Sequence, residues 1–311
     1  MKHFIWIFIT LIIFCSCKGS STKSGNDVSV DPNPTTETLQ PFILPDIPAM
    51  YTDPELRAKY LLEHYWENFN LADTNYIHHP EISEQAWADF LNIMNHVPLN
   101  TAQSAMTSFM EKAETNKKVY LYFTELADRY LYDPNSPYRN EEIYIPVLEA
   151  MKSSSILDDT EKTRPTARLK LAYKNRINTK AINFKYTINT GKQSSLYDIK
   201  TDYTLIYFNN PGCHACQEIT EGLKISMLIN QLVKEKHLTI LAVYPDEDLE
   251  EWRIHQSDFP AEWINGYDKK QTLNDQYDLK AIPTLYLLDR NKVVVLKDTT
   301  LPEIENYFLS L

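Results

Sequence analysis

The feature that most constrains the fold of this chain is a Cys-x-x-Cys sequence, Cys213-His-Ala-Cys216, which lies between two patterned segments. The apolar run 204–208 before it predicts a buried strand, and the spacing of apolar residues after it predicts a helix from 214. This order places Cys213 at a helix N-terminus, where the helix dipole favours the thiolate over the thiol. Pro283 stands directly before a second predicted strand, 284–288. Together the two motifs indicate thiol–disulfide chemistry.

The N-terminus has the pattern of a bacterial export signal. Met1-Lys2-His3 precedes an apolar run, 4–14, that is too short to span a bilayer permanently. Ser16-Cys17 follows, and a small residue before a cysteine at this place resembles the lipobox of bacterial lipoproteins. The resemblance implies that residues 1–16 are a signal peptide and that Cys17 is acylated after cleavage. A plain secretory signal cleaved after Gly19 is the alternative.

The four cysteines of the chain then divide simply. Cys15 leaves with the signal peptide and Cys17 carries the lipid, so Cys213 and Cys216 are the thiols that remain. A structural disulfide gains most by closing a long loop, and this pair closes almost none. Outside the cytoplasm, an isolated close pair therefore favours a catalytic role.

Zinc binding is another use of a Cys-x-x-Cys sequence. Zinc needs two further ligands, and the mature chain has no second cysteine pair. Capture of a metal by Cys213, His214 and Cys216 ranks last, because ligands so close in sequence rarely fill a coordination sphere. The histidines of the N-terminal half form no i, i+4 pair on a predicted helix. We therefore expect no metal and no other cofactor.

Composition and charge limit the possible partners. Residues 17–45 are rich in Ser, Thr, Asn, Asp and Pro, which predicts a disordered tether. The net charge of −11 argues against nucleic acid and against adsorption to an anionic surface. The acyl chains on Cys17 should therefore hold the protein at the membrane.

Two domains that differ in predicted secondary structure follow the tether. The pattern of residues 46–178 predicts an all-α domain of unknown function. Asp53-Pro54 marks the start of its first helix, and Ser83 opens the second. Further helices are expected at 99–114, 117–132, 140–152 and 160–177. Its many aromatic residues are expected mainly in the core. Residues 179–311 alternate between strands and helices and predict an α/β domain.

Within the α/β domain, strands are expected at 182–188, 204–208, 237–244, 284–288 and 293–297. The helix from 214 should carry Ile219, Leu223, Met227 and Leu228 on its core side. Short helices are expected around 249–255 and 270–277, and a closing helix at 301–311. The thiols then lie at the end of a central strand.

Residues 207–216 and 281–289, with the turn 190–192, resemble membrane-tethered thioredoxin-fold proteins of the TlpA/ResA type over about residues 180–311. The helical half, through the segment 57–69, resembles the uncharacterised helical domain that precedes such modules in Gram-negative lipoproteins. The resemblance implies a lipid-anchored protein in a Gram-negative envelope, facing the periplasm, with the outer membrane favoured over the inner.

The resemblance also implies roles for single residues. Cys213 is the exposed nucleophile and Cys216 the buried resolving thiol. Pro283 is expected in cis, with the backbone of Ile282 pairing with the substrate. His214 and Ala215, between the cysteines, are expected to tune the redox properties; His214 either stabilises the Cys213 thiolate or points to solvent.

The chain departs from the pattern of the resembled family at two positions. Gly212 replaces the usual tryptophan before the first cysteine, and Tyr207 replaces the buried acid of classical thioredoxins. Deprotonation of Cys216 therefore lacks its usual base, and Glu218 or Asp246 is a candidate substitute.

The resulting prediction is a membrane-anchored extracytoplasmic thiol–disulfide oxidoreductase that reduces protein disulfides and depends on a membrane or periplasmic electron donor. An oxidase or isomerase of the same fold stays open. A second hypothesis is a peptide- or protein-binding lipoprotein that uses the thioredoxin fold as a platform.

Overall fold

The computed structural model describes residues 40–311, which form one compact unit. The predictions for the signal peptide, for acylation of Cys17 and for nearly all of the tether lie outside these residues. None of the described helices is long and apolar enough to cross a membrane.

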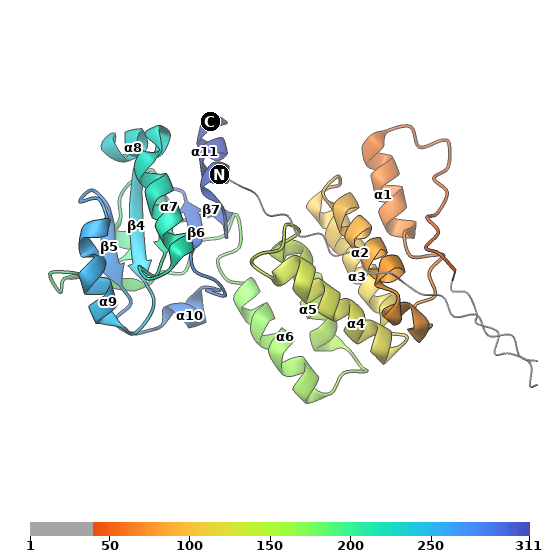
Figure 1. The fold of residues 1–311 in the computed structure, drawn as a ribbon. Helices are drawn as coiled ribbons and strands as arrows, with labels where there is room; N and C mark the ends of the chain where they lie inside the picture. The colour runs from red at the N-terminus through yellow and green to blue at the C-terminus, as the bar shows by residue number, and fades with distance from the viewer. Residues whose placement is uncertain (1–39) are drawn as a thin grey trace, which may run out of the picture. The chain divides into compact units, whose positions relative to one another are not determined.

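The N-terminal part of the described chain is helical (Figure 1). Its helices are α1 (Pro54–His64), α2 (Pro80–Met94), α3 (Leu99–Ala113), α4 (Lys117–Ala127), α5 (Glu141–Ser153) and α6 (Asp159–Ala172), with a 3₁₀ helix at Thr74–His78 and a π-helical turn at Asp128–Tyr132 that continues α4. Side chains of the residues that precede four of these helices accept hydrogen bonds from their first turns, as expected of N-caps: Asp53, Asn116, Asn140 and Asp158.

Aromatic side chains fill the core of the helical part, as the sequence predicts. The rings of Trp66 and Phe109 lie 4.6 Å apart between centroids, and those of Phe109 and Phe123 lie 4.9 Å apart. Phe42, before the first helix, packs on Tyr65 at 4.9 Å. Aromatic pairs at these distances add stability beyond their buried area.

Two helix limits in this part differ from the predictions. Helix α2 begins at Pro80 instead of Ser83, because proline suits the first turn, where its missing N–H is not needed. Ser83 is instead buried, with its hydroxyl 2.8 Å from that of Tyr122. Helix α6 ends at Ala172, short of the predicted 177.

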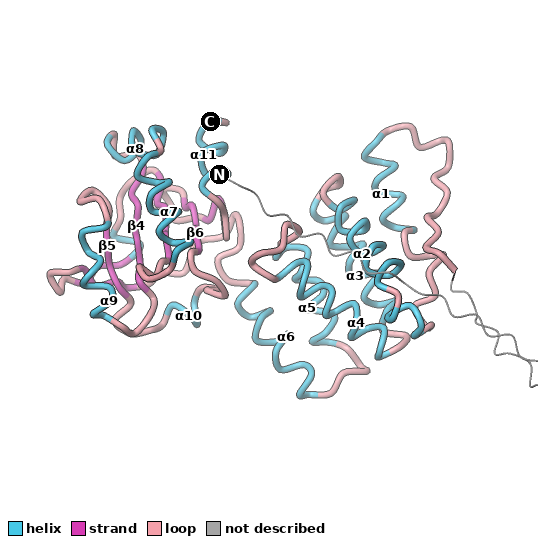
Figure 2. Tube along the Cα trace, viewed as in Figure 1, coloured by secondary structure: helices cyan, strands magenta, loops and turns pink. Residues whose placement is uncertain are grey.

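The C-terminal part is an α/β domain, and Figure 2 shows its strands in magenta. Seven strands of the described chain form one sheet in the order β2-β1-β5-β4-β3-β6-β7. The strands are β1 (Lys185–Ile188), β2 (Gln193–Ser195), β3 (Tyr203–Phe208), β4 (Leu238–Tyr244), β5 (Ile264–Tyr267), β6 (Thr284–Leu288) and β7 (Val294–Lys297). The helices are α7 (His214–Ile225), α8 (Met227–Lys234), α9 (Leu249–Ile254), α10 (Leu273–Gln276) and α11 (Leu301–Leu309), with 3₁₀ turns at Leu196–Asp198 and His255–Asp258.

Strand β3 lies in the middle of the sheet, parallel to β4 and antiparallel to β6. Its alternate side chains enter two separate cores. Leu205 and Tyr207 pack with Cys216 and residues of α7, α8 and α11, whereas Ile206 and Phe208 pack on the opposite face. The strand is therefore buried on both sides, which fits its continuous apolar sequence.

Two features of this domain correct the predictions. Strand β5 was not predicted, because Asn265 and Gly266 interrupt its apolar pattern. The predicted long helix from 214 is broken at Ser226, which caps the new helix α8. The break turns Met227 away from the core, so Met227 is 88% exposed, and Leu228 is only half-buried.

Candidate functional site

The two thiols lie where strand β3 passes into helix α7. Cys213 is the residue that caps α7, and its side chain is half-buried. The turn before it is fixed by Asn210, whose side-chain oxygen accepts from the Gly212 N–H at 3.0 Å and whose carbonyl accepts from the Cys213 N–H at 3.0 Å. The thiol thus stands at the positive end of a helix dipole, as predicted.

Cys216 lies one turn into α7 and is only 2% exposed. Among the described residues the cysteines are these two, and both are free thiols. The Asn210 N–H donates to the Cys216 sulfur at 3.4 Å. Burial raises the pKa of the Cys216 thiol to about 12, so this thiol is protonated at neutral pH. The pair therefore combines an accessible thiol with a sheltered one.

The loop before strand β6 lies against Cys213. The Ile282–Pro283 peptide bond is cis, as the resemblance implied. The Cys213 thiol donates to the carbonyl oxygen of Ile282, with 3.6 Å between sulfur and oxygen. Residues far apart in sequence, Cys213 and Ile282, thus form one surface.

Tyr207 takes the place of the expected buried acid. Its hydroxyl donates to the Cys216 carbonyl at 2.6 Å and lies 3.0 Å from the Thr220 hydroxyl. Burial keeps the pKa of Tyr207 well above its usual value, so the phenol stays protonated. Tyr207 therefore supports the helix that carries Cys216 and does not accept its proton.

Neither proposed substitute for the base contacts Cys216 within residues 40–311. Glu218 lies 3.5 Å from the His214 ring nitrogen, and Asp246 accepts from the Asn210 side-chain amide at 2.9 Å. Both residues are exposed, whereas the Cys216 thiol is buried. The structure gives these two residues other partners.

The residues around the thiols form an open rim. The His214 side chain is 85% exposed and Ala215 is exposed as well, so the structure favours the alternative in which His214 points to solvent. A Cβ atom on Gly212 would lie 3.3 Å from a carboxylate oxygen of Glu251 on α9. A tryptophan side chain in place of Gly212 would therefore meet the Glu251 carboxylate at this rim.

A cavity of about 250 Å³ lies behind the buried thiol. Its lining includes Cys216, Tyr207, Thr220 and Phe259. No sequence pattern indicated this cavity or the contacts of Asn210, because both depend on how the turn between β3 and α7 meets distant loops. Within residues 40–311, no group of three or more His, Cys, Asp or Glu side chains is placed to hold a metal ion.

Comparison with known proteins agrees with this architecture. Residues 16–175 match the family described as a domain of unknown function, DUF5106, and residues 201–294 match the family described as thioredoxin-like. A thioredoxin-like protein from Bacteroides caccae has a solved structure that is 59% identical, with a TM-score of 0.85, and the match covers 88% of this chain and 99% of that one.

Two further solved structures match the C-terminal part. The C-terminal domain of an uncharacterised protein from Bacteroides fragilis is 53% identical over 43% of this chain and 98% of its own, with a TM-score of 0.43. The thioredoxin domain of a thiol–disulfide oxidoreductase from Bacteroides vulgatus is 24% identical over 43% and 96%, with a TM-score of 0.39. No curated protein matches the chain.

The fold and the paired thiols thus define a thioredoxin-like protein. The chain belongs to the DUF5106 family, and a thioredoxin-like domain follows its helical domain. The predicted resemblance and the predicted fold class are therefore confirmed.

Proposed function

We propose that this protein is a thiol–disulfide oxidoreductase that reduces disulfides of other proteins through Cys213 and Cys216. The observation that carries the proposal is the arrangement of the two thiols. Cys213 is accessible at a helix N-terminus, Cys216 is buried one turn later, and the Ile282 carbonyl lies beside the accessible sulfur. A protein that only binds its partner has no physical need for both thiols.

The reaction follows from this arrangement. The Cys213 thiolate attacks one sulfur of a substrate disulfide, forming a mixed disulfide and releasing the other substrate sulfur as a thiolate that takes up a proton. Cys216 then loses its proton and attacks the Cys213 sulfur. This step forms the Cys213–Cys216 disulfide and releases the second substrate thiol. Two electrons and two protons reach the substrate, so a dithiol donor must reduce the pair again.

The location is part of the same proposal and rests on the sequence. Acylation of Cys17 would tether the protein to an envelope membrane, on the periplasmic side, with the outer membrane favoured. The chain after the tether would then meet exported proteins, whose cysteines are commonly oxidised there. The donor is expected to be a dithiol protein of the membrane or the periplasm.

The first test measures reduction of insulin disulfides by dithiothreitol, with the chain lacking residues 1–17 as catalyst. The wild type should accelerate the reaction, and Cys213→Ser should abolish the acceleration because it removes the attacking sulfur. Cys216→Ser keeps that sulfur but cannot release the substrate by itself, so with insulin and no dithiothreitol it should accumulate a mixed disulfide. Full activity of Cys213→Ser would end the proposal.

The reduction potential of the Cys213–Cys216 pair decides the direction of electron flow. A value near about −270 mV or below marks a reductant, and one near about −120 mV marks an oxidant. If the pair forms no disulfide anywhere in that range, the protein is a binding module that uses the thioredoxin fold as a platform.

A further inference from the structure

The helical domain contacts the segment that leads to Pro283. This segment, residues 273–282, is named here the strap; it contains α10 and ends at Ile282, beside the Cys213 sulfur. The Ile282 carbonyl lies 3.6 Å from the Cys213 sulfur, so the backbone of the strap borders the place where a substrate disulfide would meet this thiol. The position of the strap therefore shapes the site.

The first contacts with the strap come from residues at the end of the helical domain. The side chain of Lys174 donates to the Asp275 carbonyl, and that of Asn175 donates to the Gln276 carbonyl at 2.8 Å. The Asn175 side chain also accepts from the Ile182 N–H at 2.7 Å, and Asn175 is buried. Main-chain groups of the strap are thus held by side chains outside it.

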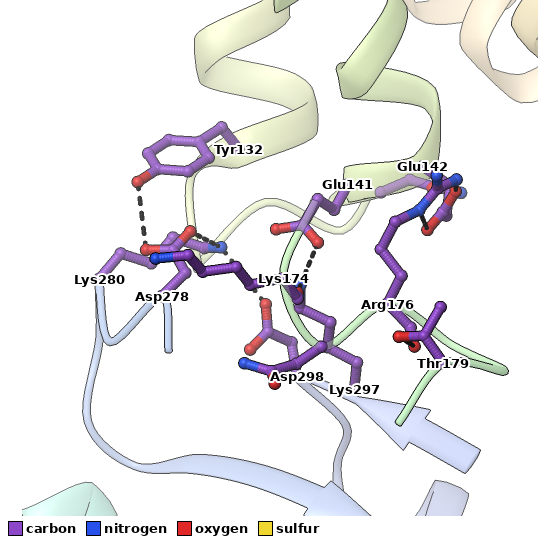
Figure 3. Close-up of polar contacts among 12 residues, drawn as sticks. Tyr132, Glu141, Glu142, Lys174, Arg176, Thr179, Asp278, Lys280, Lys297 and Asp298 are labelled. Atoms are coloured by element: carbon purple, nitrogen blue, oxygen red, sulfur yellow. Dashed lines mark hydrogen bonds and ion pairs between the residues drawn. The ribbon is translucent and has the colours of Figure 1, made fainter. Parts of the chain in front are cut away.

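The second set of contacts with the strap is made by Tyr132, the last residue of the π-helical turn (Figure 3). Its hydroxyl lies 3.5 Å from a carboxylate oxygen of Asp278, and its ring centroid lies 4.6 Å from the Lys280 ammonium. The Arg168 guanidinium lies 4.1 Å from the same ring centroid. Cations at these distances are attracted to the ring.

Lys280 is the centre of a buried ionic cluster that both domains share. Its ammonium lies 3.0 Å from Asp278 and 3.3 Å from Asp298, and the three side chains are 8–9% exposed. Arg139 of the helical domain pairs with the same Asp298. Buried ion pairs are weak evidence for stability, but removing one partner leaves a charge without compensation. Moving Lys280 out of this cluster would therefore leave the carboxylates of Asp278 and Asp298 without its charge.

We propose that the helical domain positions the strap through Tyr132 and Lys280, and in this way sets how a substrate disulfide meets Cys213. Tyr132 and Lys280 are positioning residues, because neither touches the sulfur atoms. This inference rests on the proposed function. It assigns a role to the helical domain, whose family is described as a domain of unknown function.

The test compares four variants in the chain lacking residues 1–17. Tyr132→Leu removes the ring and the hydroxyl, Tyr132→Phe removes the hydroxyl alone, and Lys280→Met removes the ammonium from the strap side. Tyr130→Leu is the matched control, because Tyr130 lies in the same π-helical turn but contacts Glu84 and Tyr138 of the helical domain. Thermal unfolding confirms that each variant is folded.

Two readouts separate positioning from general damage. Hydrogen exchange of the amides at 278–282 should become about tenfold faster in Tyr132→Leu and Lys280→Met, because the contacts that close this segment are lost. The KM for insulin should rise about fivefold while kcat stays within about twofold, because the thiols on α7 are unchanged. Tyr132→Phe should fall between the wild type and Tyr132→Leu, and Tyr130→Leu should match the wild type.

The double variant Tyr132→Leu/Lys280→Met should show less than the sum of the two single effects, because each single variant already removes the contact between Tyr132 and Lys280. Unchanged exchange and KM in the folded single variants would overturn the positioning role. Equal changes in Tyr130→Leu would do the same. If the wild type does not reduce insulin, the proposed function fails, and the exchange measurement still decides whether the helical domain holds the strap.

Discussion

At the scale of single residues, the notable feature is how the buried thiol is kept neutral. Tyr207 fills the place of the expected acid, and its hydroxyl is already engaged by the Cys216 carbonyl and Thr220. The Asn210 N–H is the nearby donor to the Cys216 sulfur. Burial outweighs that hydrogen bond, so the pKa of Cys216 is raised. In the proposed reaction, the attack by Cys216 therefore requires a proton acceptor from the substrate or the solvent.

The raised pKa of Cys216 predicts how its alkylation rate depends on pH. In a Cys213→Ser variant, alkylation of Cys216 by iodoacetamide should keep rising about tenfold per pH unit through pH 11, because the thiolate is the nucleophile and the pKa is about 12. The same variant unfolded in guanidinium is the control, and its rate should level off near pH 9 to 10. A plateau below pH 10 in the folded variant would contradict the assignment.

At the scale of elements, the break between α7 and α8 decides which side chains reach the core. Ser226 accepts from the Ile229 N–H at 3.3 Å and donates to Glu305 of α11 at 2.5 Å. It therefore caps one helix and links it to another. The apolar periodicity of 219–228 suggested one continuous helix, because periodicity does not record a change of helix axis.

Loss of this cap should be measurable. Ser226→Ala should lower the free energy of unfolding by about 1–2 kcal/mol, since α8 loses its N-cap and Glu305 loses a donor. Ser153→Ala is the control: Ser153 is exposed and its hydroxyl bonds only to carbonyls of its own helix, so a change within about 0.5 kcal/mol is expected. Urea unfolding with an unchanged m-value gives both numbers, and equal effects would contradict the capping role.

At the scale of the described unit, the two domains are joined by charged groups taken out of water. Lys297 of β7 pairs with Glu141 of α5 and also donates to the Lys174 carbonyl at 3.0 Å. Figure 3 shows Glu141 and Lys297 next to the Tyr132–Lys280 contact. Burial raises the pKa of the Glu141 carboxyl, and Lys297 acts against this change. The pair therefore depends on both partners.

Removing the cation should destabilise the unit strongly. Lys297→Met should lower the free energy of unfolding by about 3 kcal/mol, because the Glu141 carboxylate stays buried without its partner. Lys59→Met is the control, because Lys59 and Glu63 are about half exposed and 3.9 Å apart, and a loss within about 0.5 kcal/mol is expected. Similar losses of unfolding free energy in both variants, measured by urea unfolding, would show that the buried pair contributes no more to stability than the exposed one.

Local sequence was sufficient for the parts of the site that follow one element. The Cys-x-x-Cys segment lies at the end of a continuous apolar strand, and the position of Cys213 at the start of a helix follows from that order alone. The proline before β6 was recognised in the same way, because it precedes another apolar strand. Strand β5 was missed, because a four-residue strand with Asn265 and Gly266 carries no alternation to detect.

Local patterns in the sequence were enough to locate the paired thiols and the order of the domains, because turns and periodic apolar residues act over a few neighbouring positions. The partners that surround the thiols became visible only in the folded chain. It gave Glu218 and Asp246 contacts away from Cys216, turned Met227 to the surface, and brought Tyr132 to Lys280. Each of these outcomes depends on packing between segments far apart in the chain, and no local pattern records such distances.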